Sequence, residues 1–375
     1  MPTSPYQALL RCNDCPLPPI KFVRINVAYP LLSMSLATTL FAGCSANSSE
    51  DTTTSISNSA QSSESTHPVE TGPKGELPGG SGGGGFGGGS IDTSNIKIKY
   101  IDVAYDSQSD TQKLDIYLPN EGEAPFPVII ALHGGGFMLG NKTGGDLTST
   151  IKGVEHGYAV VSVDYRLSGE AVFPAAISDV KAAIRYIKAN AEKYNLDPDK
   201  IAVWGDSAGG NLAALAGTSG DVDNDFLNGD NTENLDYTSE VQAVVDWFGP
   251  LEFTKMDEQF EASGITPMMG TTNSDSSAES KYIGGNVAEN EELAQKANPA
   301  NYISENDPYF FIEHGTEDAN VPTQQSIDFA EKLQKVIGEN KVTLTLLEGA
   351  KHGGEQFDTD DNLKKVFNFF DGVLK

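Results

Sequence analysis

The stretch that most constrains how this chain can fold is residues 201–215, which read IAVWGDSAGGNLAAL. An apolar strand pattern runs into a Gly-rich turn and leaves as a helix of small residues, with Ser207 at the apex of the turn. Glycine is expected at positions 205 and 209 because close packing of such a helix on its strand leaves no space for side chains. The flanking strand and helix argue against an ordinary Gly-rich loop. The pattern predicts a serine hydroxyl held at the positive end of a helix, where negative charge is favoured.

The N-terminal part of the chain has the features of an export signal. Lys21 and Arg24 precede a mostly apolar run over residues 27–41, which ends in small residues and Cys44. The run is too short to be a comfortable membrane span. We expect residues 1–44 to be a lipoprotein-type signal segment with lipidation at Cys44, so that the protein is exported and anchored at a bacterial cell surface. Ordinary secretion, with cleavage nearby and no lipid, is the alternative.

Composition divides the rest of the 375-residue chain into a linker and one domain. Residues 45–94 are rich in Ser and Thr and then in Gly, and have almost nothing apolar to bury. They are predicted to form a flexible tether. Residues 95–375 are long enough for a single folded domain and carry the apolar patterns that a core requires.

Charge and cysteine content limit the partners and cofactors of this domain. The formal net charge of −28 disfavours binding to nucleic acid or directly to an anionic membrane, so that neutral substrates fit better. No cysteine follows Cys44, which excludes a disulfide or a thiolate metal site from the domain. An Asp-rich stretch over residues 221–232 begins like a calcium loop but has Phe226 where glycine is required and Thr232 where glutamate is required. We expect a solvated loop there and no metal site.

Strand and helix patterns alternate along the domain. Two alternating segments predict a solvent-facing antiparallel pair at a sheet edge, and six more continuously apolar segments predict interior parallel strands. The eight strand segments are 96–101, 113–118, 126–132, 159–164, 201–204, 242–248, 309–313 and 342–347, and helical patterns lie near 146–156, 174–194, 208–217, 323–337 and 361–374. The prediction is an α/β fold with a mostly parallel eight-stranded sheet flanked by helices in three layers. Residues 251–306 lack a strand pattern and form either a short partial lid over the carboxyl edge of the sheet or a decorated surface loop.

A serine nucleophile needs a base and an acid that orients the base. His352 follows the last predicted strand on a loop that can reach the same sheet edge as Ser207, whereas the other histidines of the domain are expected to fix loops. A carboxylate would hold the histidine tautomer. Asp318 follows the preceding strand, and its neighbour Glu317 also qualifies. We favour Asp318 because it is shorter and lies closer to the stop at Pro322, and because of the family resemblance that its motif carries.

Residues 132–137, which read LHGGGF, follow an early strand and could supply hydrogen-bond donors to an oxyanion. We assign these donors to the backbone N–H groups of Gly135 and Gly136, with Ala208 after the serine as a third. A phosphate-binding loop is the rival use of such glycines, but no Lys-Ser/Thr follows. His133 is expected to hydrogen-bond the loop.

Four motifs in this order resemble the α/β-hydrolase esterase/lipase family. They are HGGGF at 133–137, GDSAGG at 205–210, HGTEDANVP at 314–322 and KHGG at 351–354. The similarity covers about residues 97–375 and is greatest to the acetyl xylan and feruloyl esterase-like branch. It implies a triad of Ser207, Asp318 and His352, oxyanion donors from the HGGG loop, no cofactor, and an ester substrate.

The substrate is expected to carry a short or aromatic acyl group. Phe137 follows the oxyanion loop and Trp247 ends a strand, so their rings are predicted to line the cleft and stack on a sugar or a feruloyl ring, with core packing as the alternative for Trp247. The resemblance favours acetyl or feruloyl esters on plant polysaccharide such as xylan. A general short-chain esterase or lipase, a serine peptidase on the same fold and a non-catalytic binding module are the alternatives.

Overall fold

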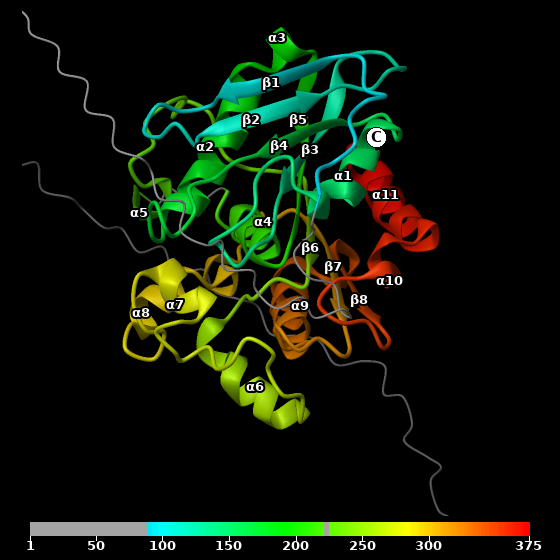
Figure 1. The fold of residues 1–375 in the computed structure, drawn as a ribbon. Coiled ribbons are helices and arrows are strands. Elements are labelled where there is room, and N and C mark those ends of the chain that lie inside the picture. The colour runs from blue at the N-terminus through cyan, green and yellow to red at the C-terminus, as the bar shows by residue number, and fades with distance from the viewer. Residues whose placement is uncertain (1–88, 221–224) are drawn as a thin grey trace, which may run out of the picture. The chain divides into compact units, whose positions relative to one another are not determined.

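The fold is organised around one eight-stranded sheet (Figure 1). The structure is a computed structural model that describes residues 89–220 and 225–375. The strands lie in the order β1-β2-β4-β3-β5-β6-β7-β8. Their bounds are β1 Lys99–Ala104, β2 Lys113–Tyr117, β3 Phe126–Leu132, β4 Ala159–Val163, β5 Leu196–Asp206, β6 Ala243–Trp247, β7 Tyr309–Gly315 and β8 Val342–Leu347. The predicted signal segment, Cys44 and the linker up to residue 88 lie outside the described residues.

Strand direction agrees with a mostly parallel sheet. β2 pairs antiparallel with both β1 and β4, and the pairings from β4 through β8 are parallel. In the parallel part the carboxyl ends are aligned, with Leu132 opposite Gly205 and Asp206 opposite Trp247. The predicted α/β fold class is confirmed. The loops that follow β3, β5 and β7 therefore meet at one edge of the sheet.

Two details of the strand prediction are wrong. β2 was expected to face solvent, but it lies between β1 and β4 and its Leu114 and Ile116 are fully buried. β8 was expected in the interior, but it forms the opposite edge of the sheet and is only partly buried. The alternation of Thr and Leu in β8 is typical of a half-exposed strand, whereas strand order is set by long-range packing that a local pattern does not contain.

Helices cover both faces of the sheet. Alternate residues of β3 pack into different cores: Val128 and Ile130 lie in the cluster with α2, α4 and α9, and Ile129 lies in the cluster with α11. The helix bounds are α1 Thr148–Ile151, α2 Ala175–Ala189, α3 Ala191–Tyr194, α4 Ala208–Thr218, α9 Gln324–Ile337 and α11 Asp360–Leu374. The period of two along each strand thus produces the three predicted layers.

Helices also occupy the segment for which the sequence predicted a lid or a loop. It contains α6 Met256–Ser263, α7 Ala278–Ile283 and α8 Glu291–Lys296, with short 3-10 helices before α6 and after α8. Two further short helices are α5 Asp225–Asn228 and α10 Glu355–Asp358. Within the described part of the chain, no helix combines the length and apolar character needed to cross a membrane.

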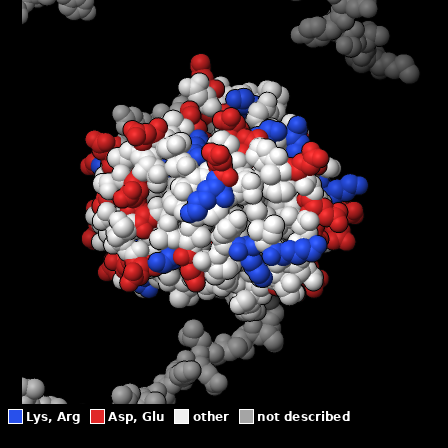
Figure 2. Space-filling view, turned by 90° about the horizontal axis from the view of Figure 1, so that it is seen from above, with Lys and Arg blue, Asp and Glu red and all other residues white. Residues whose placement is uncertain are grey.

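The packed domain starts earlier than the predicted boundary at residue 95. Ser90 forms a β-bridge with Gly144, and Ile91 is buried and donates its N–H to Thr143 O at 3.0 Å. The last residues assigned to the linker therefore belong to the folded domain. On the face drawn in Figure 2, most acidic side chains lie toward the rim, and the mostly uncharged middle carries several basic side chains.

Candidate active site

Ser207 occupies a sharp turn between β5 and α4. Its φ of +54° is a strained, left-handed conformation for a residue other than glycine. A Cβ at Gly205 would lie 2.1 Å from Gly209 O, and one at Gly209 would lie 2.2 Å from Leu132 O. Both approaches are to backbone atoms, so the predicted steric reason for these glycines is confirmed.

The structure brings together the three side chains that were predicted as a triad. His352 Nε2 lies 2.9 Å from Ser207 Oγ, and His352 Nδ1 lies 2.7 Å from Asp318 Oδ2. Ser207 follows β5, Asp318 follows β7 and His352 follows β8, so three strand ends supply the groups. With its proton on Nδ1, His352 donates to Asp318, and its Nε2 can accept the proton of the serine hydroxyl.

Asp318 is held as an anion by its surroundings. Burial favours its neutral form, but the charge of His352 and hydrogen bonds from His352 and His314 outweigh burial and hold the pKa of Asp318 well below its usual range. Its other oxygen, Oδ1, accepts the N–H groups of Asn320 and Val321 at 2.7 and 2.9 Å. The competing candidate, Glu317, is exposed.

His314 is a neighbour of this carboxylate that sequence reasoning did not place. It was expected to fix a loop, and it does: its Nε2 lies 3.0 Å from Val321 O and its Nδ1 lies 2.7 Å from Ser326 Oγ. The same Nε2 also lies 3.2 Å from Asp318 Oδ2. The spacing of four residues between His314 and Asp318 was the sequence feature that could have indicated this contact.

The loop after β3 has the geometry expected of a donor loop. Gly135 and Gly136 have φ values of +107° and +59°, and a Cβ at Gly135 would lie 2.2 Å from Leu139 O. Gly134 N donates to Asp146 Oδ2 at 2.9 Å, which fixes the start of the loop. Among the described residues, none accepts a hydrogen bond from the N–H groups of Gly135 and Gly136. Together with the Ala208 N–H, their role as oxyanion donors stays a prediction.

His133 supports this loop, as expected from its position beside the glycines. Its Nδ1 lies 2.8 Å from Gly134 O, and its ring stacks on Tyr165 with 4.3 Å between the ring centres. The Tyr165 hydroxyl donates to His133 O at 2.7 Å. Burial lowers the pKa of His133, which keeps the imidazole neutral.

The prediction that Phe137 and Trp247 offer aromatic surface to the cleft needs correction. Phe137 is 1% exposed and stacks on Tyr282 of α7 at 3.8 Å, while Trp247 is 5% exposed and packs edge-on against Trp204. Phe137, with a φ of +60°, packs against α7, a helix that the sequence did not predict. Both rings are therefore core residues in this structure.

Phe248, next to Trp247, is the aromatic residue in contact with the triad. Its ring packs edge-to-face on His352 with 4.7 Å between centres, and on Phe357 of α10 at 4.8 Å. Its φ of +44° is again left-handed, and its N–H donates to Glu313 O at 2.8 Å. Strain of this kind persists where the surrounding structure fixes it. Phe248 thus holds one side of the imidazole in place.

The segment predicted as a partial lid is docked on two loops of the site. A Cβ at Gly136 would lie 3.2 Å from the Ala278 side chain of α7, and Tyr282 stacks on Phe137. Between α6 and α7, Met268 N donates to Ala319 O, next to Asp318, at 2.8 Å. The side chains of Met268 and Met269 are 68% and 65% exposed. The segment therefore borders the site and places apolar side chains in solvent beside the acid loop.

The buried Glu313 of β7 is expected to make the stability of the folded protein depend on pH, independently of catalysis. It is fully buried, its Oε2 accepts from Asn362 Nδ2 at 2.9 Å, and burial raises its pKa to about 7 from 4.5. Between these values the folded protein keeps a proton that the unfolded chain has released, so the free energy of unfolding falls as pH rises through this window. We expect Glu313→Gln to be more stable than the parent at pH 8 by about 3 kcal/mol and to differ little at pH 4.5.

Urea unfolding of both proteins at the two pH values measures this difference. Glu317→Gln, which changes an exposed carboxylate four residues away, is the control and should follow the parent. Equal stability changes for Glu313→Gln at both pH values would contradict the assignment of the proton to Glu313.

Comparison with known proteins agrees with this geometry. The family model BD-FAE matches residues 114–333. The probable carboxylic ester hydrolase LipM and the esterase LipQ, both of Mycobacterium tuberculosis, are each 32% identical to the chain over 63% and 60% of its length. These alignments cover 52% and 50% of the relatives, so the chain spans about half the length of the curated relatives it matches.

Two solved structures are similar in both sequence and fold. A bifunctional GH43-CE protein of Bacteroides eggerthii is 37% identical, with a TM-score of 0.66 over 74% of this chain and 36% of that one. A truncated carbohydrate esterase from gut microbiota is 31% identical, with a TM-score of 0.67 over 76% of this chain and 99% of that one. An esterase of Thermogutta terrifontis, at 22% identity and a TM-score of 0.54 over 75% of this chain and 92% of that one, shares the fold.

Proposed function

This chain belongs to the BD-FAE family, and on that basis we propose that it is a serine carboxylesterase that removes short or aromatic acyl groups from carbohydrate. The observation that carries the chemistry is the continuous path from Ser207 Oγ through His352 to Asp318, at 2.9 and 2.7 Å. No cofactor is required by this chemistry, since serine, base and acid are all supplied by the chain.

The reaction proceeds through an acyl-enzyme. Ser207 Oγ attacks the ester carbonyl carbon as its proton passes to His352 Nε2, and the carbonyl oxygen becomes an oxyanion bound by the N–H groups of Gly135, Gly136 and Ala208. His352 then gives the proton to the departing alcohol oxygen as the C–O bond breaks. A water molecule attacks the acyl carbon and transfers a proton to His352. The bond between that carbon and Ser207 Oγ then breaks, the carboxylic acid leaves, and His352 returns the proton to Ser207 Oγ. Asp318 stays ionised throughout.

Support for a carbohydrate-linked ester comes from the relatives. The truncated gut esterase is named a carbohydrate esterase, and the Bacteroides eggerthii protein is a GH43-CE bifunctional protein. The net charge of −28 agrees with a neutral polysaccharide such as acetylated or feruloylated xylan. We propose these esters as the substrate class.

A general short-chain esterase is the second candidate. Phe137 and Trp247 are buried, which removes the aromatic stacking surface that the sequence had suggested for a sugar or a feruloyl ring. The curated relatives are named only as ester hydrolases. Both observations fit an enzyme without carbohydrate preference.

A substrate panel separates the two candidates. We expect higher kcat/KM on acetylated xylan or methyl ferulate than on a simple acetate ester, and falling kcat/KM on p-nitrophenyl esters as the acyl chain lengthens beyond about four carbons. Activity on p-nitrophenyl acetate without activity on any carbohydrate ester would favour the general esterase. Preference for acyl chains beyond about eight carbons would contradict both.

We also propose that the protein is exported and held at the cell surface through a lipid on Cys44. The support is the charged and apolar pattern of residues 21–44, followed by a Ser/Thr- and Gly-rich tether. Mass spectrometry of the mature N-terminus, with Cys44→Ala as the comparison, tests this proposal. An unmodified terminus downstream of Cys44 would overturn it in favour of secretion.

A further inference from the structure

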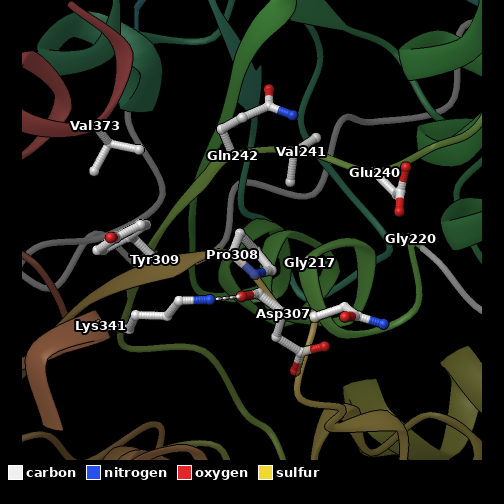
Figure 3. A pocket seen from close by; sticks show the side chains of 11 residues that line it. Gly217, Gly220, Glu240, Val241, Gln242, Asp307, Pro308, Tyr309, Lys341 and Val373 are labelled. Atoms are coloured by element: carbon white, nitrogen blue, oxygen red, sulfur yellow. Dashed lines mark hydrogen bonds between the residues drawn. The ribbon is translucent and has the colours of Figure 1, made fainter. Parts of the chain in front are cut away.

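A cavity lies at the end of the sheet opposite the candidate active site. It has a volume of about 370 Å³ and is formed where β6 and β7 begin (Figure 3). Ser207 and Asp318 follow the carboxyl ends of β5 and β7, and the seven residues of β7 span about 20 Å. The cavity lining includes neither of these residues nor His352. The cavity is therefore a separate feature of the domain.

Hydrogen bonds hold the cavity walls in place. Gln242 Oε1 accepts the N–H of Ile201 at 2.8 Å, and Gln242 O accepts the N–H of Tyr309 at 3.2 Å. Lys341 Nζ donates to Asp307 O at 3.0 Å, the bond drawn in Figure 3. On the helix side, a Cβ at Gly220 would lie 2.8 Å from Glu240 Cα. Because these contacts join separate strands and loops, a ligand would meet a preformed wall.

The lining combines aromatic, aliphatic and charged side chains. Tyr309 is 37% exposed, and Lys341 Nζ lies 5.6 Å from the centre of its ring. In Figure 3, Tyr309 and Val373 lie on one side of the cavity, and the exposed Glu240 lies on the other. The Tyr309 ring and the Val373 side chain thus line the same cavity as the charged groups of Lys341 and Glu240.

This mixture favours a neutral, hydroxyl-rich ligand. Glu240 and the net charge of −28 disfavour an anion, and Lys341 disfavours a cation. A sugar ring has apolar C–H faces that can pack on Tyr309 and Val373. Its hydroxyl groups can donate to the Glu240 carboxylate and accept from the Lys341 ammonium. A purely apolar ligand would offer no hydrogen bond to the Glu240 carboxylate or the Lys341 ammonium.

We propose that this cavity is a non-catalytic binding site for a saccharide unit of a neutral polysaccharide. The inference rests on the proposed function, since it supposes that the ester substrate is carried by such a polymer. A chain held there raises the local concentration of ester groups near the enzyme. The effect is expected on polymeric substrates and not on small esters.

Affinity electrophoresis tests binding without hydrolysis. Full-length Ser207→Ala protein is run in native gels with and without soluble xylan or galactomannan, alone and combined with Tyr309→Ala or Glu240→Ala. We expect retardation by xylan, weakened about tenfold by Tyr309→Ala, because that change removes one aromatic contact surface. Tyr237→Ala is the control: Tyr237 is 45% exposed and does not line the cavity.

The outcomes separate this site from the proposed function. Equal retardation of the Tyr309→Ala, Glu240→Ala and Tyr237→Ala proteins overturns the site, as does the absence of retardation by both polysaccharides. In the active enzyme, Tyr309→Ala should raise the ratio of KM on acetylated xylan to KM on p-nitrophenyl acetate, and an unchanged ratio counts against the site. If Ser207→Ala is retarded by xylan but the parent enzyme hydrolyses no ester, the site is retained and the proposed function is removed.

Discussion

Replacement of Ser207 by alanine is expected to lower kcat on p-nitrophenyl acetate by at least about 10⁴. The substitution removes the Ser207 hydroxyl, which lies 2.9 Å from His352 Nε2 and is the nucleophile of the proposed mechanism. Folding should be retained because alanine is smaller than serine. Ser207 already has a Cβ at this strained φ of +54°, so alanine adds no new steric conflict. Initial rates with parent and variant at equal concentration measure the effect.

A covalent probe tests the same prediction without relying on a particular substrate. A fluorophosphonate should label the parent at Ser207 and leave Ser207→Ala unlabelled. Ser263→Ala, a change at an exposed serine of α6, should retain labelling and activity. Near-normal hydrolysis by folded Ser207→Ala would exclude the acyl-enzyme mechanism.

The second large effect is expected from Asp318→Asn, which should lower kcat by about 10⁴. The new amide can keep its oxygen on the N–H groups of Asn320 and Val321, so that its NH₂ group faces His352 Nδ1. A donor at that position stabilises the tautomer with hydrogen on Nε2, which cannot accept the Ser207 proton. Both kcat, measured by steady-state kinetics, and the rate of fluorophosphonate labelling should fall.

Glu317→Gln is the matched control for this change. It alters the neighbouring carboxylate, which is exposed and was the rival candidate for the acid. Activity within about twofold of the parent is expected, as for most surface substitutions away from a site. If Glu317→Gln lost activity and Asp318→Asn kept it, the assignment of the acid would be reversed.

The parts of the site that the sequence predicted share a local cause. Ser207, Asp318 and His352 each follow an apolar strand, and the carboxyl ends of parallel strands meet at one edge, so strand patterns predicted that they lie near each other. The choice of Asp318 over Glu317 also relied on the family resemblance. The glycines at 205 and 209 were also readable, because a tight strand-to-helix turn has a steric requirement that does not depend on the rest of the fold.

What the sequence missed depends on contacts between distant segments. Phe248 meets His352, and Tyr282 meets Phe137, across more than a hundred residues of chain, and no local period encodes such pairs. The burial of Trp247, in contrast, could have been predicted from the alternation of residues along its strand. Ala243, Val245 and Trp247 alternate along β6 and share the face covered by α11, so the period of two already placed that ring in the core.

The docking of the segment between β6 and β7 has a consequence for redesign. It is fastened at Met268 to the acid loop and at Ala278 and Tyr282 to the donor loop, while the residues between these points make no hydrogen bond to the triad. Thr272 is a further anchor, because it is buried and its N–H donates to Asp257 Oδ1 at 2.7 Å. The exposed residues 269–271 therefore form an exchangeable cassette, in which loops of other lengths can be grafted between Met268 and Thr272. Libraries confined to that cassette would vary what surrounds the entering acyl group while keeping the geometry of Ser207 and His352.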